Sequence, residues 1–177
     1  MSPTIKLPAE FVPVHCKHLK RFGCDDDGGY LIDSRSLEEA DIVLSLGIND
    51  NWTFEEAVTA TYRLPLHCYD PTTSFRLIFH RWFKALGRVF SDISHLKGRW
   101  ARLTQLTSAM LSYKSFSTKH ATFHREWVAS SENDSVSFQD CLDRIDQQDR
   151  VFVKIDIEGS EYALLNCLLS NQNRFTG

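Results

Sequence analysis

Three observations predict an α/β fold with a mostly parallel sheet. Short apolar runs of strand length alternate with longer stretches of helical periodicity along the 177-residue chain. The run VFVKIDI at residues 151–157 is rich in β-branched residues and leads through a Gly-Ser pair into a helical stretch. Acidic residues gather at the predicted strand ends, which is where open α/β sheets bind their ligands.

Length and composition indicate one globular domain. The hydrophobic fraction of 42% and the charged fraction of 24% are ordinary for a folded protein, and no apolar run is long enough for a transmembrane helix. The first residues contain no apolar stretch of the kind found in secretory signals. The cysteines are odd in number and lack the spacing of a disulfide framework, so we expect reduced thiols and a cytoplasmic protein; they are Cys16, Cys24, Cys68, Cys141 and Cys167.

Residues 1–17 contain three prolines and little periodicity, which predicts an extended N-terminal arm before a single domain at 18–177. Residues 18–33 place two short apolar runs around an acidic, glycine-rich turn, a pattern typical of a hairpin. The neighbouring group His15, Cys16, His18 and Cys24 could in principle ligate a metal. Its spacing matches no standard zinc pattern, so no metal site is predicted.

A βαβ unit is predicted next. Residues 41–46 form a short apolar strand, residues 52–62 a helix, and residues 66–69 a second strand that ends at an Asp-Pro pair. Later in the chain we expect a third strand within 121–129 and a polar loop at 130–135. A short helix at 138–145, the strand at 151–157 and a helix at 161–169 complete the expected elements.

Residues 74–118 are predicted to form a basic helical insertion. Apolar residues recur at helical spacing over 74–111, in two helices interrupted near Gly87 and Gly98. Residues 74–120 hold nine Lys or Arg and one acid, whereas the rest of the chain holds eleven basic and twenty-two acidic residues. This segment could meet an anionic acceptor, a membrane surface or nucleic acid. We favour an apolar face on the core and a solvated basic face, which disfavours nucleic acid and a membrane surface as partners.

The loop between the first βαβ strand and its helix is a candidate ligand site. Gly47 permits a tight turn, and Asn49, which stands where a second glycine would be expected, tolerates a left-handed backbone. Asp50 would repel a pyrophosphate, which argues against NAD or ATP and for a ligand with a positive group or sugar hydroxyls. The alternative is a plain strand–helix turn.

Further acids follow the other predicted strands. Asp70 lies twenty-three residues beyond Gly47 and is placed to accept ribose hydroxyls, although an Asp-Pro turn is the alternative. Asp134 belongs to a polar loop that could meet an adenine edge or simply be solvated surface. Asp156 and Glu158 end the last strand, where the alternative is a solvated helix start.

Four segments together resemble the FkbM-type S-adenosylmethionine-dependent methyltransferases: DDDGGYLID (25–33), LSLGINDNWTFEE (44–56), HCYDPT (67–72) and VFVKIDIEGSEYALL (151–165). The resemblance implies a Rossmann-like class I methyltransferase sheet. It implies that the Gly47 loop, with Asn49 and Asp50, holds the methionine part of S-adenosyl-L-methionine and that Asp70 holds its ribose. A sulfonium donor is cationic, so acids in this loop would be favourable.

The same resemblance places Asp156 and Glu158 at the transfer site, where one could act as general base towards an acceptor hydroxyl. In relatives, further strands follow the point at which this sequence stops. We therefore expect a sheet that is incomplete on its C-terminal side, with an unpaired apolar edge at 151–157 and a homodimer through that edge.

The expected function is S-adenosylmethionine-dependent methyl transfer to a sugar or another small hydroxyl-bearing acceptor. The alternative is a truncated, catalytically inert domain that acts as a binding module through its basic insertion. The missing glycines and Asp50 disfavour an NAD-dependent enzyme.

Overall fold

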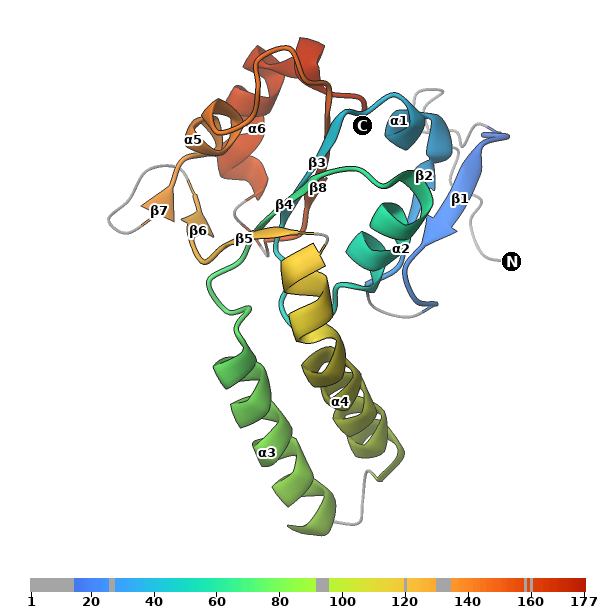
Figure 1. Ribbon diagram of the computed structural model, residues 1–177, viewed down its shortest axis with the longest axis vertical. Helices are drawn as coiled ribbons and strands as arrows, with labels where there is room; N and C mark the ends of the chain where they lie inside the picture. Colours follow the sequence, from blue (N-terminus) through green and yellow to red (C-terminus); the bar gives the residue numbers. More distant parts are fainter. Residues whose placement is uncertain are drawn as a thin grey trace, which may run out of the picture.

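The computed structural model describes residues 15–25, 28–91, 96–119, 121–129, 135–157, 159 and 161–177. It confirms an α/β fold built on a four-stranded parallel sheet (Figure 1). The strands are β3 (Ile42–Leu46), β4 (Leu66–Tyr69), β5 (Thr122–His124) and β8 (Val151–Ile155), in the spatial order β5-β4-β3-β8. This is third, second, first, fourth in chain order, which is compatible with a Rossmann-like fold.

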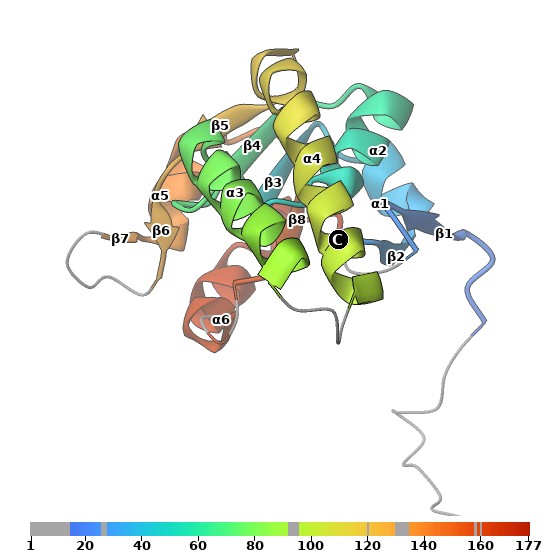
Figure 2. The ribbon, with the colours of Figure 1, turned by 90° about the horizontal axis from the view of Figure 1, so that it is seen from below.

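Helices cover both faces of this sheet (Figures 1 and 2). Side chains alternate along β3, so Val43 packs on one face while Ile42, Leu44 and Leu46 pack on the other. The first face meets residues of α2 (Thr53–Tyr62) and α4 (Leu96–Lys119), and the second meets residues of α5 (Phe138–Asp143) and α6 (Glu161–Ser170). A strand buried on both faces explains why residues 42–46 are almost continuously apolar.

Near the N-terminal end, β1 (Leu19–Phe22) and β2 (Tyr30–Asp33) pair antiparallel, with Phe22 opposite Tyr30. A short helix that the sequence did not predict follows, α1 (Ser34–Glu38). The Asp33 side chain caps it by accepting a hydrogen bond from the backbone N–H of Arg35. Phe22 and Leu37 anchor this region in the core on the α2 side of the sheet.

The insertion consists of α3 (Phe75–Ser91) and α4, which lie side by side and project away from the sheet (Figure 1). The two expected helices are present, but Gly87 and Gly98 both lie inside them and do not themselves end a helix. One glycine weakens a helix by only about 1 kcal/mol, which does not end a helix that is held by tertiary packing. No helix in the described ranges has the length and apolar character needed to cross a bilayer.

The single strand expected within 121–129 is two short strands. β5 joins the parallel sheet beside β4, whereas β6 (Trp127–Val128) leaves it and pairs with β7 (Ser135–Val136). The chain turns away from the sheet after His124, so the third strand of the sheet is only three residues long.

The sequence predicted an unpaired edge along residues 151–157, but part of the edge of β8 is paired. After the 3₁₀ turn η2 (Gln172–Arg174), the chain runs parallel to β8. The backbone N–H of Thr176 donates to the carbonyl of Val151 at 3.1 Å, and the N–H of Val153 donates to the carbonyl of Gly177 at 3.0 Å. The first residues of this edge are therefore paired. The homodimer through it stays a prediction.

Candidate functional site

A cavity of about 320 Å³ opens at the carboxyl ends of β3, β4 and β8. It is lined by five of the residues singled out in the sequence: Gly47, Asn49, Asp50, Asp70 and Asp156. The remaining two, Asp134 and Glu158, lie outside the described residues. Segments more than a hundred residues apart in sequence therefore converge on one cavity, at the place where α/β sheets bind ligands.

Gly47 is the point at which the three strand ends meet. Its φ of +76° lies in the left-handed region, and a Cβ there would stand 1.9 Å from the backbone oxygen of Asp156. Its N–H donates to the carbonyl of Tyr69 at 3.0 Å, and its own carbonyl accepts from Nζ of Lys154 at 2.6 Å. The turn is thus possible only for glycine, on grounds of both conformation and space.

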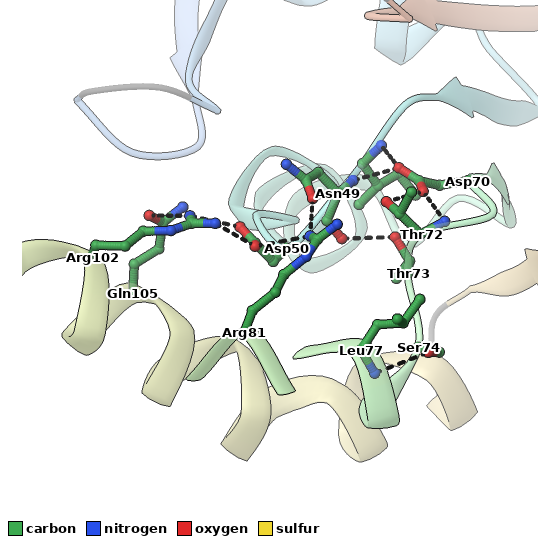
Figure 3. A network of polar contacts seen from close by, with 11 residues as sticks. Asn49, Asp50, Asp70, Thr72, Thr73, Ser74, Leu77, Arg81, Arg102 and Gln105 are labelled. Carbon is green, nitrogen blue, oxygen red and sulfur yellow. Dashed lines mark hydrogen bonds and ion pairs between the residues drawn. The ribbon is translucent and has the colours of Figure 1, made fainter. Parts of the chain in front are cut away.

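Asn49 has a φ of +55°, so the left-handed backbone expected of it is present. Its carbonyl accepts a hydrogen bond from the Thr73 hydroxyl at 2.7 Å, and its side-chain oxygen accepts one from Arg81 (Figure 3). The loop is therefore attached both to the segment after β4 and to helix α3.

Both oxygens of the Asp70 carboxylate accept hydrogen bonds from neighbouring groups of the protein (Figure 3). One oxygen accepts from the N–H groups of Ile48 at 2.9 Å and Asn49 at 2.6 Å, and the other accepts from the N–H and hydroxyl of Thr72, both at 2.6 Å. Burial alone would raise the pKa of Asp70, but these hydrogen bonds outweigh it and lower the pKa. The four bonds match the capacity of a carboxylate, so the geometry favours the Asp-Pro turn role over direct ribose contact.

Asp50 is buried and carries an ion-pair cluster. Arg102 of α4 donates two hydrogen bonds to it, at 2.6 and 2.9 Å, and Arg81 of α3 donates one at 3.1 Å (Figure 3). Two guanidinium groups on one carboxylate leave a net charge of +1 at this wall of the cavity. Contrary to the expectation from sequence, the paired Asp50 does not repel anions, and part of the basic insertion faces the site rather than solvent.

Asp156 differs from the other two acids because its side chain is about half exposed, at 49%. The hydroxyl of Tyr30 donates to its Oδ2 at 2.5 Å, and Nζ of Lys154 lies 3.9 Å from the same oxygen. None of the described residues hydrogen-bonds to Oδ1 of Asp156. This carboxylate is held in place on one side and open to the cavity on the other.

A buried ion pair lies beneath the Gly47 loop. Nζ of Lys154 is 3.4 Å from Oε1 of Glu55, which also accepts a hydrogen bond from the Ser45 hydroxyl at 2.6 Å. Glu55 is fully buried, and its Oε2 has no hydrogen-bond partner among the described residues. This pair was not predicted from the sequence, although a lysine inside the β-branched strand 151–157 is a visible signal of it.

An aromatic cluster of the buried Tyr69 and two partly exposed histidines borders the cavity on the β4–β5 side. The ring of His124 stacks on Tyr69 with 4.2 Å between centroids, and its Nε2 lies 3.2 Å from Nδ1 of His67. Burial, His67 and Arg144 together lower the pKa of His124. Among the residues that the structure describes, no group of three His, Cys, Asp or Glu side chains is arranged to hold a metal ion.

The charged residues that line the cavity are nearly balanced. Four are acidic and three are basic: Asp50, Asp70, Glu126 and Asp156 against Arg81, Arg102 and Lys154. The small negative excess, with Asp156 the half-exposed acid, suits a ligand that is neutral or carries one positive charge.

Three comparisons with known proteins test whether this site belongs to a described family. No family model matches the chain, and neither the search of curated proteins nor the search of solved structures gives a match. The function is therefore argued from the geometry of the cavity and from the sequence motifs that line it.

Proposed function

We propose that this protein is an S-adenosylmethionine-dependent methyltransferase that methylates a hydroxyl oxygen of a small acceptor such as a sugar. The observation that carries the proposal is the convergence of the Gly47 loop, Asp70 and Asp156 on one cavity at the strand ends. Its volume, about 320 Å³, is within the range of small-molecule sites.

The residues of the cavity fit such a cofactor. The Gly47 loop brings backbone close to the ligand space, and the carboxylate of Asp156 faces the cavity, where it would attract a sulfonium. Asp70 acts as a positioning residue that fixes the loop. The Thr72 hydroxyl, which donates to Asp70 and keeps acceptor capacity, is the better candidate for a ribose contact.

When bound, the cofactor supplies a methyl group on a positively charged sulfur. Asp156 would take the proton of the acceptor hydroxyl at Oδ1, the oxygen that no described residue hydrogen-bonds, as the acceptor is methylated. Tyr30 and Lys154 hold the carboxylate from the other side, so its orientation is fixed before the acceptor arrives.

A second cavity, of about 600 Å³, is a further observation in favour of a hydroxyl-bearing acceptor. It adjoins the first, with which it shares Asp50, Asn51, Arg102 and Gln105. Half of its remaining lining residues carry side chains that can hydrogen-bond to hydroxyls; they are Thr53, Glu56, Thr104, Ser108 and Ser112.

Isothermal titration of the full chain with S-adenosylmethionine and S-adenosylhomocysteine tests the proposal. We expect the wild type to bind both. Asp156→Asn should weaken S-adenosylmethionine by about fivefold and S-adenosylhomocysteine far less, because only the former carries the positive sulfur. Glu38→Gln, an exposed acid away from the cavity lining, is the matched control and should change neither affinity.

A folded wild-type chain that binds neither compound would overturn the proposal and favour the non-catalytic alternative. Where both bind, transfer of a labelled methyl group to mono- and oligosaccharides identifies the acceptor. Equal weakening of both compounds by Asp156→Asn would show that this carboxylate does not face the sulfur.

A further inference from the structure

Helix α3 exposes a row of phenylalanines. Phe75, Phe79 and Phe83 recur every four residues and are 49%, 47% and 64% exposed, whereas Ile78 is fully buried and Val89 is 6% exposed. Residues four apart lie on one line along a helix, so the three rings form a stripe beside the buried face. The apolar face of α3 is therefore wider than the core covers, contrary to the expectation that it packs wholly inward.

A basic row runs next to this stripe. Arg76, His80 and Lys84 each follow a phenylalanine by one position and are exposed. Residues 74–91 contain no acidic residue at all. The Arg81 guanidinium, by contrast, turns to Asp50 and the cavity. The outer face of α3 thus joins an apolar stripe to positive charge, and a complementary partner must be both apolar and anionic.

We propose that this face of α3 binds an anionic lipid surface. A helix with phenylalanines on one line and Lys, Arg and His beside them lies in the plane of a membrane, with its rings at the acyl boundary and its cations among the lipid phosphates. The 17 residues of α3 present a convex rod about 25 Å long. Neither of the two cavities includes a phenylalanine of the stripe.

The projecting position of α3 would let its outer face contact a flat lipid surface. It projects from the sheet together with α4 (Figure 1), and α4 lies along one side of it (Figure 2). A peptide would need a groove to gain comparable burial, whereas a bilayer accepts a stripe on a convex helix. This inference does not depend on the proposed methyl transfer, because the stripe lies outside both cavities.

Co-sedimentation of the full chain with vesicles tests the inference. We expect binding to vesicles of equal parts phosphatidylcholine and phosphatidylserine, little binding to phosphatidylcholine alone, and weakening by salt because the attraction is partly ionic. Phe83→Ser should weaken binding by about tenfold, since one exposed ring no longer inserts. Arg76→Gln and Lys84→Gln should each weaken it by about fivefold.

Leu77→Ser is the matched control for Phe83→Ser. Leu77 is 40% exposed on the same helix but lies off the phenylalanine line, so its substitution should leave vesicle binding unchanged. Thermal unfolding verifies that every variant is folded. Absence of binding to the anionic vesicles, or binding that Phe83→Ser does not reduce, would overturn the inference. Dissociation of a dimer by Phe83→Ser, with vesicle binding unaltered, would instead assign the stripe to a second copy of the chain.

Discussion

The acids that follow β3 and β4 and the acid that follows β8 use the same residue type in different ways. After β3 and β4, Asp50 and Asp70 are buried, and hydrogen bonds and ion pairs from the protein occupy them. After β8, Asp156 is half exposed and is held by Tyr30 through one oxygen only. Carboxylates at strand ends therefore separate into those that fix the loop and one that is available to a ligand.

This difference teaches that position at a strand end does not by itself make an acid functional. What distinguishes the acids is how much of each carboxylate the protein already uses. Substitutions at the buried, fully bonded Asp50 and Asp70 should alter stability, whereas a substitution at Asp156 should alter ligand binding and chemistry.

The largest effect on stability is expected for Gly47→Ala. The added Cβ would meet the backbone oxygen of Asp156 at 1.9 Å in a left-handed conformation, so we expect a loss of about 4 kcal/mol or more in the free energy of unfolding. Urea unfolding measures it. Gly87→Ala is the matched control, because a Cβ there meets nothing within 4 Å, and it should stabilise by about 0.5–1 kcal/mol. Equal effects of the two substitutions would contradict the tight convergence at Gly47.

The second-largest loss in the free energy of unfolding is expected when the Lys154–Glu55 ion pair beneath the Gly47 loop is broken. Lys154→Met leaves the buried Glu55 carboxylate without its cation and should cost about 3–4 kcal/mol. Adding Glu55→Gln removes the uncompensated charge and should restore at least half of the loss. Lys20→Met, at an exposed position of β1, should change stability by less than about 0.5 kcal/mol. A double variant as unstable as Lys154→Met alone would show that the pairing is not what matters.

Asp70→Asn should cost about 2–3 kcal/mol at neutral pH, because three backbone N–H groups and the Thr72 hydroxyl lose a charged acceptor. The pKa of Asp70 is lowered on folding, so its contribution is full above the unfolded pKa of about 3.9 and disappears as pH falls through the lower folded value. Unfolding free energies at a series of pH values should show the wild type and variant converging in acid. A constant difference between them would contradict a charged Asp70.

The smallest effect on stability is expected for Asp156→Asn, below about 1 kcal/mol, since the side chain is half exposed. The same substitution should abolish most methyl transfer, because the amide cannot accept the hydroxyl proton. Tyr30→Phe keeps the carboxylate and removes only its anchor, so it should retain partial activity. Transfer of labelled methyl, together with urea unfolding, separates the two kinds of loss.

The sequence predicted that the segments around Gly47, Asp70 and Asp156 meet, but it did not predict which basic residues neutralise the acid Asp50 beside them. The strand-ending motifs around Gly47, Asp70 and Asp156 are local, so a rule about strand ends brings them together. The partners of Asp50 are Arg81 and Arg102, 31 and 52 residues away on an insertion whose packing no local pattern fixes. Charge segregation showed that the insertion was basic but not which arginines turn inward.

The fold shows the same division between local and long-range information. The strands of the parallel sheet were predictable from apolar runs, whereas the exact ends of α3 and α4 were not, because packing of α3 on α4 overrides the weak preference of Gly87 and Gly98. The pairing of Thr176 and Gly177 with β8 also depends on tertiary contact. No periodicity could have signalled a strand of so few residues.

The most direct test of the central claim is to map the binding site by NMR. With S-adenosylhomocysteine added to isotopically labelled full chain, the account predicts amide shift changes concentrated at residues 47–51, 70, 72 and 156–157. Residues of α3 beyond Arg81 and of β1 should remain unperturbed. Saturating additions that leave residues 47–51 and 156–157 unchanged would contradict the claim that this cavity is the cofactor site.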